Sequence, residues 1–260
     1  AQSVLAEARE MIADALGCEP IEVVFTGSGT EADNIAVRGF AQAAAHRGET
    51  PRIVTTPIEH PAVKETVSAL SAGATHADVD YLPVTSTGHI EDLSLLQSPA
   101  SVAAVMWANN ETGAIQPVAE AARACQETGT PLHVDAVQVV GHLPVDFSSL
   151  GATTLAASAH KFGGPRGVGI LLAKRSPVPS PIITGGGQQR GIRPGTPDAA
   201  GVIATAVALK EAVDEMDAER TRLTQLTARL RSGLEESVDK LVVHTCEPNL
   251  PGHLFVSFPG

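Results

Sequence analysis

The stretch EVVFTGSGTEADNIAVRGFAQAAAHRGETPRIVTT (residues 22–56) decides the fold. Its apolar runs at 22–26 and 52–56 are short and rich in β-branched residues, which is typical of strands covered on both faces. Residues 30–46 lie between them with the apolar spacing of a helix, and a glycine-rich turn precedes this helix. A strand, a helix and a second strand in this order predict a βαβ unit in a parallel sheet.

The same alternation continues along the chain. Further strands are predicted at 79–83, 102–108, 131–137, 154–158 and 168–174. Further helices are predicted at about 2–16, 61–72, 91–97 and 117–128. The sequence therefore predicts an α/β fold with a mostly parallel sheet and helices on both faces.

The pattern changes after about residue 197. Residues 198–238 read as a long helical stretch, with a break expected near Asp214–Asp217, where acidic residues cluster. The runs KLVVHT and HLFVSF then predict two strands. We expect residues 1–215 to form a large domain and 216–260 to begin a smaller α+β domain. The chain starts inside a helical pattern and stops after a strand-like run, so we expect both ends to be cut.

Composition narrows the class of partner. The formal net charge is -11 and no basic patch stands out, which argues against nucleic acid or an anionic membrane as the main partner. The three cysteines lie far apart and form no CxxC pair, as in a reduced, cytoplasmic protein. No run approaches the roughly 20 apolar residues of a membrane span, and the opening residues lack the pattern of a signal peptide.

Ligands of open parallel sheets bind beyond the carboxyl ends of the strands. After the first predicted strand, TGSGTEADN places Gly27 and Gly29 before Thr30, which we expect to open a helix. The free N–H groups and the dipole at such a helix start favour a phosphate. The alternative for this stretch alone is an ordinary glycine-rich turn with Thr30 as the N-cap of the helix.

Polar residues also follow three other strands. His60, in IEHPAV, is expected at a helix start, where its imidazole either is satisfied locally or stacks on a flat ligand and moves protons. Asn109 and Asn110 either build a turn or bind a polar ligand. Asp135 interrupts an apolar run, and a carboxylate there is costly unless it meets a cation or hydrogen-bond donors. Gln138 follows three residues later.

Lys161 follows the sixth strand in SAHK, among small residues and glycines. A lysine in a crowded, partly dry site has a lowered pKa and is a nucleophile suited to Schiff-base chemistry. Alone, it would equally be a solvated loop lysine. Together, a helix start for a phosphate, Asp135 for a pyridinium nitrogen and Lys161 for an aldehyde are the three groups that pyridoxal phosphate requires.

Six motifs, in order over roughly residues 20–200, resemble the class V branch of fold-type I pyridoxal-phosphate enzymes, and most of all the cysteine desulfurases of the NifS/IscS type. They are FTGSGTEADN, IEHPAV, MWANNETGAIQP, HVDAVQ, SAHKFGGPRGVG and GGGQQRGIRPGTPD. The NNETG and GGGQQRGIRPGT segments favour a desulfurase over an aminotransferase. Ala159 stands where the family often has glycine.

The resemblance implies a role for each matching residue. Lys161 would bond covalently to the cofactor and shuttle protons, Asp135 would pair with the ring nitrogen, and His60 would stack on the ring and assist proton transfer. The remaining implied contacts are Asn110 and Gln138 with the ring hydroxyl, Gly29, Thr30, Ser158 and His160 with the phosphate, and Thr196 with the phosphate of the other subunit's cofactor in a homodimer. No metal site is expected.

The implied reaction converts L-cysteine to L-alanine and leaves sulfur as a persulfide on an enzyme cysteine. A sulfur acceptor, such as an iron–sulfur scaffold protein, then collects it for iron–sulfur cluster or thio-cofactor synthesis. The family's nucleophilic cysteine and substrate-binding arginine are expected beyond the printed chain. Cys18 and Cys125 are expected to be packing residues and Cys246 incidental, so the chain as printed is expected to hold cofactor without completing sulfur transfer.

Three alternatives stay open. The first is another class V enzyme, such as a selenocysteine lyase or an aminotransferase. The second is a dinucleotide-binding oxidoreductase, because Gly27, Gly29 and Ala32 fit the GxGxxA fingerprint, although Glu49 and Glu59 both miss the place of its acid. The third is a homologue without catalytic activity that only dimerises or docks a scaffold.

Overall fold

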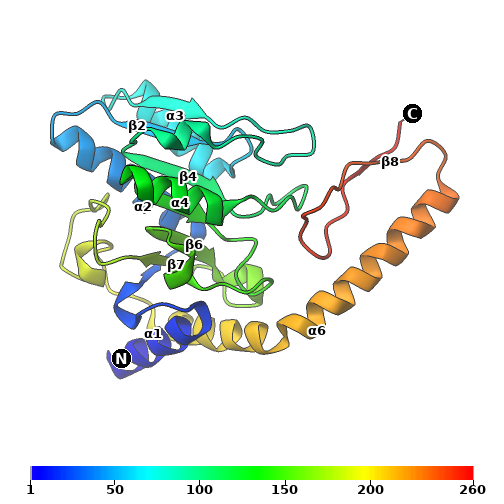
Figure 1. Cartoon of the computed structure of the whole chain (residues 1–260). Helices are drawn as coiled ribbons and strands as arrows, with labels where there is room; N and C mark the ends of the chain where they lie inside the picture. The colour runs from blue at the N-terminus through cyan, green and yellow to red at the C-terminus, as the bar shows by residue number, and fades with distance from the viewer. Residues whose placement is uncertain (1, 260) are drawn as a thin grey trace.

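The computed structural model describes residues 2–259 and contains a seven-stranded sheet in the order β1-β7-β6-β5-β4-β2-β3 (Figure 1). Strand β7 runs antiparallel to both of its neighbours, and every other pairing is parallel. The seven predicted strands and the mostly parallel sheet are thereby confirmed. Their bounds are β1 Val23–Thr26, β2 Arg52–Thr55, β3 Asp78–Tyr81, β4 Val102–Met106, β5 Leu132–Asp135, β6 Thr154–Ser158 and β7 Gly169–Ala173.

Helices cover both faces of the sheet, as the continuous apolar strands predict. On β4, Val102 and Ala104 face one core and Ala103 and Val105 face the other, because successive side chains of a strand point to opposite faces. Helices α2 and α3 pack on the first face, and α1, α4, α5 and α6 contribute to the second. The helices are α1 Gln2–Leu16, α2 Gly29–His46, α3 Pro61–Ala72, α4 Val118–Thr128, α5 Phe147–Leu150 and α6 Ala199–Ser237.

One predicted helix is wrong, and one short helix was not predicted. The helix expected at 91–97 is only a 3-10 turn, η2 (Ser94–Gln97). The side chain of Asp92 accepts a hydrogen bond from the backbone N–H of Ser94, and such a bond stabilises a turn in competition with an α-helix. The short helix α5 has no counterpart among the predictions. Asp146 caps it by accepting from the backbone N–H of Ser149.

Helix α6 runs without the break expected near Asp214–Asp217. Those acids pair along the helix with cations one turn away: Asp214 with Lys210, and Asp217 with Arg220. Pairs at this spacing support a helix instead of ending it. The expected division between residues 215 and 216 falls inside α6 and stays a prediction.

Figure 1 shows α6 leading away from the sheet to a small hairpin near the C-terminus. The hairpin pairs β8 (Val242–Val243) with β9 (Val256–Ser257) in antiparallel fashion, so both late strands are present in a shorter form than predicted. Across residues 2–259, no helix combines the length and the apolar character that a membrane crossing requires.

Candidate active site

A cavity of about 200 Å³ lies beyond the carboxyl ends of β1, β2, β4, β5 and β6, where the fold type places ligands. All the predicted site residues except Thr196 line it: Gly29, Thr30, His60, Asn110, Asp135, Gln138, Ser158, His160 and Lys161. Ser28, Asp33, Met106, Ala108 and Val137, which the sequence reasoning did not single out, line it as well.

The start of α2 forms one end of the cavity. The helix is capped by Ser28, whose hydroxyl accepts from the backbone N–H of Glu31 at 3.1 Å. Thr30, the N-cap in the alternative interpretation, lies inside the first turn instead. The first N–H groups of a helix have no partner within it, so those of Gly29 and Thr30 are left for an anion. A Cβ at Gly29 would lie 2.7 Å from Cγ2 of Val137, so only glycine leaves this approach open.

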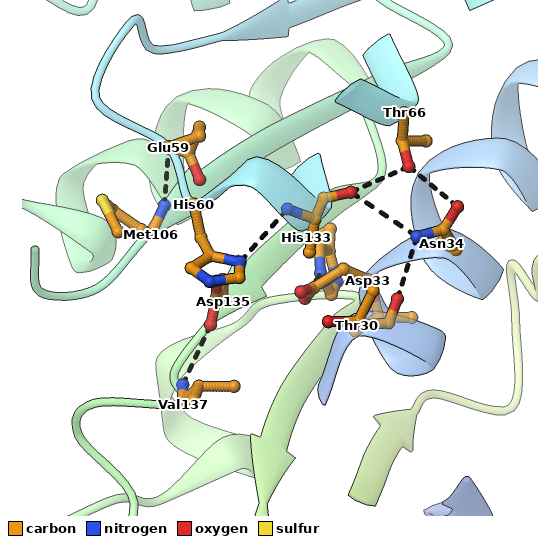
Figure 2. Close-up of polar contacts among 12 residues, drawn as sticks. Thr30, Asp33, Asn34, Glu59, His60, Thr66, Met106, His133, Asp135 and Val137 are labelled. Carbon is orange, nitrogen blue, oxygen red and sulfur yellow. Dashed lines mark hydrogen bonds and ion pairs between the residues drawn. The ribbon is translucent and has the colours of Figure 1, made fainter. Parts of the chain in front are cut away.

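His60 caps α3, as the sequence predicts. Its Nδ1 accepts from the backbone N–H of Ala62 at 3.1 Å, so the proton of the neutral ring lies on Nε2. The Asn34 amide donates to the carbonyl of Thr30 at 2.9 Å and to that of Ala62 at 3.5 Å, which joins the first turns of α2 and α3 (Figure 2). The phosphate-type helix start and the imidazole are therefore held together.

Asp135 ends β5 and is buried, with 6% of its surface exposed. One oxygen, Oδ1, accepts from the backbone N–H of Val137 at 3.0 Å (Figure 2). Burial raises the pKa of this carboxyl to about 7, and ionisation of Asp33 would raise it further. A cation placed against Asp135 would favour its ionised form, so the site is suited to a ligand with a protonated ring nitrogen.

The two asparagines after β4 have different roles. Asn109 is buried and builds the turn: its Oδ1 accepts from the backbone N–H groups of Glu111 and Thr112, both at 2.9 Å, and its Nδ2 donates to the carbonyl of Ile58 at 3.1 Å. Asn110 instead lines the cavity. Asn109 is therefore a turn residue, and ligand binding by Asn110 stays a prediction.

Lys161 lies in a 3-10 turn, η3 (Ala159–Phe162), that follows β6. Its side chain lines the cavity but is exposed in this chain, so the expected partly dry environment is wrong for the chain alone. The ring of His142 fixes the turn, because its Nε2 donates to the backbone carbonyl of Lys161 at 2.9 Å. Lys161 belongs to none of the ion pairs formed within residues 2–259, which leaves the amine available for a ligand.

Thr196 is exposed and lies outside the cavity-lining set. It belongs to the glycine-rich segment 185–198, which the Arg193 side chain ties to Glu31 in the first turn of α2. Its expected contact with a cofactor of another subunit stays a prediction.

The cysteines described by the structure are not placed for chemistry in this cavity. Cys125 is buried in the core, Cys18 packs beside that core, and Cys246 is exposed. Burial raises the pKa of Cys18 and of Cys125 to about 12, so both thiols stay protonated and unreactive. The packing roles predicted for Cys18 and Cys125 agree with this.

Two residues missed by the sequence reasoning stand out. Asp33 follows Thr30 by three residues, which on a helix places both on one face. His133 precedes Asp135 by two residues, which on a strand places both on one face. These spacings were available in the sequence as signals, but the contact between α2 and β5 was not.

The residues present fit pyridoxal phosphate. An open helix start suits its phosphate, a buried carboxyl with one oxygen left over suits its ring nitrogen, and an unpaired amine suits its aldehyde. Gly29 strengthens this fit, because any larger residue would fill the space beside the helix start. The sequence predicts three groups for this cofactor, and all three line one cavity: Lys161, Asp135 and the start of α2.

Comparison with known proteins gives consistent results. The chain is 43% identical to an IscS-like cysteine desulfurase of Mycobacterium tuberculosis over 98% of its length, and 37% identical to the cysteine desulfurase IscS of Dictyoglomus turgidum over 99%. It spans 66% and 65% of the lengths of these two relatives.

Solved structures agree. A NifS-like protein superposes with a TM-score of 0.91 at 37% identity, covering 99% of this chain and 70% of that protein. DndA of Streptomyces lividans superposes with a TM-score of 0.87 at 34% identity, covering 99% and 73%. The family described as Aminotransferase class-V matches residues 1–260. The chain therefore belongs to the class V aminotransferase family.

Proposed function

We propose that this chain is the cofactor-binding part of a pyridoxal-phosphate-dependent cysteine desulfurase, which converts L-cysteine to L-alanine and passes the sulfur to an acceptor protein. The observation that carries the proposal is that Lys161, Asp135 and the start of α2 line one cavity. The names of the relatives, at 37–43% identity over nearly the whole chain, support this activity over others of the family.

When bound, pyridoxal phosphate supplies an electron sink for the bonds at the substrate Cα. The amine of Lys161 would bind the cofactor covalently and later move a proton at that carbon. The carboxylate of Asp135 would keep the proton on the ring nitrogen, and Nε2 of His60 would assist proton transfer. The other holding groups would be the amides of Asn110 and Gln138 at the ring hydroxyl, and Gly29, Thr30, Ser158 and His160 at the phosphate.

The sulfur step needs a thiolate. The C–S bond of the substrate breaks, its sulfur bonds to the thiolate of an enzyme cysteine as a persulfide, and the substrate Cβ takes up a proton to give alanine. Cysteine and a thiol thus give alanine and a persulfide, with no external oxidant. No cysteine within residues 2–259 lines the cavity, so we assign this thiol to none of Cys18, Cys125 or Cys246.

The same proposal includes the setting of the enzyme. Thr196 would reach the phosphate of a second subunit's cofactor, so the enzyme would be a homodimer. The persulfide would pass to an iron–sulfur scaffold or another sulfur acceptor, in the cytoplasm. The exposure of Thr196, outside its own chain's cavity, supports the dimer.

The test measures products from L-cysteine with the complete enzyme that contains this chain, loaded with pyridoxal phosphate and supplied with a reductant. Equal amounts of alanine and sulfide are expected. Lys161→Ala should lower the rate by at least about a thousandfold, since it removes the covalent bond to the cofactor. Lys64→Ala, at an exposed lysine on α3, is the matched control.

Other products would point elsewhere. A keto acid in place of alanine would indicate an aminotransferase, and turnover of selenocysteine alone would indicate a selenocysteine lyase. Binding of a nicotinamide dinucleotide that does not depend on Lys161 would favour an oxidoreductase and contradict the proposal.

A further inference from the structure

A buried acid–imidazole pair joins α2 to β5 at the wall of the cavity. Oδ1 of Asp33 lies 3.0 Å from Nε2 of His133, and the side chains are 2% and 0% exposed. Nδ1 of His133 lies 2.9 Å from Oγ1 of Thr154 on β6. Both nitrogens of the imidazole are therefore engaged, and the ring cannot turn without breaking two contacts.

This pair lies close to Asp135. His133 and Asp135 are two residues apart on β5, so their side chains leave the same face of the strand. Asp33 and Asp135 both line the cavity, and Figure 2 draws these three side chains together. Two carboxyl groups that share one buried site do not both ionise readily, because each anion raises the pKa of the other.

The hydrogen-bond partners distinguish the two carboxyl groups. Oδ1 of Asp33 is engaged with His133, which is itself held by Thr154. Oδ1 of Asp135 instead accepts from a backbone N–H, that of Val137, so within residues 2–259 no titratable group is bonded to this carboxyl. If Asp33 were also an anion, it would disfavour the ionised form of Asp135, the form that pairs with a ligand cation.

We propose that Asp33 and His133 hold one proton between them as a net-neutral pair, leaving Asp135 as the single carboxylate that receives a protonated ring nitrogen. The role toward the cofactor rests on the proposed function, whereas the state of the pair does not. The pair is neutral whether the proton lies on the acid or on the imidazole, so the proposal does not depend on that division.

The charges around the pair agree with this role. Burial raises the pKa of Asp33 to about 8 and lowers that of His133 to about 4. Between about pH 4 and pH 8 the two residues therefore share one titratable proton. Glu59 and His60 lie in the connection between β2 and α3. Burial raises the pKa of Glu59 to about 8, so this carboxyl stays neutral, and the charge of His60 lowers the pKa of Asp135. His160 and Lys161 face the cavity from the end of β6.

The first test reads the proton in the cofactor-free protein at a pH of about 6. Nitrogen-15 shifts of His133 in the unaltered protein give its protonation state. Infrared difference spectra between the unaltered protein and Asp33→Asn show whether a protonated acid is lost, with Asp80→Asn on β3 as the matched control. A doubly protonated His133, or a protonated Asp33, is expected. A neutral His133 beside an ionised Asp33 would overturn the proposal.

The second test measures the dissociation constant of pyridoxal phosphate against pH. Asp33→Asn should keep it within about threefold, because an amide replaces a pair member that carries no net charge. Asp135→Asn should weaken binding by at least about tenfold. A change of about tenfold or more in either direction in Asp33→Asn would show that Asp33 carries a charge that acts on the ligand, which overturns the proposal. If no variant binds the cofactor, the proposed function fails while the first test still decides the state of the pair.

Discussion

Nε of Arg193 donates a 2.7 Å hydrogen bond to Oε1 of Glu31, while Oε2 of the same carboxylate accepts from the backbone N–H of Gly27 at 2.5 Å. One side chain thereby ties the glycine-rich segment that holds Thr196 to the turn before α2. The geometry of the phosphate-type helix start and the position of the distant segment are therefore linked within one chain.

Breaking this link should cost both stability and cofactor binding. Arg193→Gln leaves a half-buried Glu31 without its cation, and we expect a loss of about 2 kcal/mol in the free energy of unfolding. Arg47→Gln removes an equivalent but exposed pair with Glu49 and should cost less than about 0.5 kcal/mol. Urea denaturation compares the two. Equal effects would show that the Arg193 pair has no special role.

Gly29→Ala should impair the cavity without unfolding the protein. The new Cβ would lie 2.7 Å from Cγ2 of Val137 and 3.3 Å from Cβ of Ser158, so the walls must move apart at a cost of about 1–3 kcal/mol. We expect the dissociation constant of pyridoxal phosphate to rise by roughly tenfold. Gly233→Ala on α6, where a Cβ meets nothing within 4 Å, should instead stabilise slightly. Unchanged affinity in Gly29→Ala would refute the close approach.

The two asparagines after β4 should separate in their effects. Asn109→Ala leaves backbone groups of the turn without partners, and we expect a loss of about 2–3 kcal/mol in stability. Asn110→Ala should change stability by less than about 0.5 kcal/mol but weaken cofactor binding by about fivefold, since its side chain lines the cavity. Thermal unfolding and cofactor titration of both variants check this contrast. A reversed order would contradict the assignment.

Glu59 should make the cofactor-free protein less stable as pH rises. Burial raises the pKa of Glu59 to about 8, so between about pH 4.5 and 8 the folded protein keeps a proton that the unfolded chain loses. Stability contributed by this group therefore falls across that window. Urea denaturation at about pH 4.5 and at about pH 8 measures the free energy of unfolding of both proteins. From the lower to the higher pH, Glu59→Gln should become more stable than the unaltered protein by at least about 1 kcal/mol.

The matched control is Glu120→Gln, at an exposed glutamate on α4. Its denaturation should follow that of the unaltered protein across the same window. Parallel stability curves for Glu59→Gln and the unaltered protein would show that Glu59 is ionised when folded.

Most of the fold could be predicted from the sequence, because a strand that is buried on both faces is recognisable as a short, continuous apolar run. Runs such as those of β4 and β6 are apolar throughout, so their existence and type could be predicted. The break expected in α6 was wrong because clustered acids were read without their cations one turn away, such as Lys210 for Asp214. Ion pairs one turn apart determine whether clustered acids end a helix, and these pairs form only where the helix is continuous.

The site residues that could be predicted from the sequence are those at the end of a strand or just after it. Asp135 and Lys161 interrupt or follow apolar runs, where a polar residue needs an explanation. The contact between Asp33 and His133 could not be predicted, because 100 residues separate them and only the packing of α2 on β5 brings them together. The exposure of Lys161 likewise depends on which elements cover η3.

The covalent bond to Lys161 is the central claim, and it can be tested directly. The protein is loaded with pyridoxal phosphate, reduced with borohydride and digested, and the labelled peptide is identified by mass spectrometry. We predict the label on Lys161, with the visible absorption band of the bound cofactor lost in Lys161→Ala and kept in Lys64→Ala. A label on Lys64, Lys174, Lys210 or Lys240, or a trappable adduct that persists in Lys161→Ala, would contradict the account.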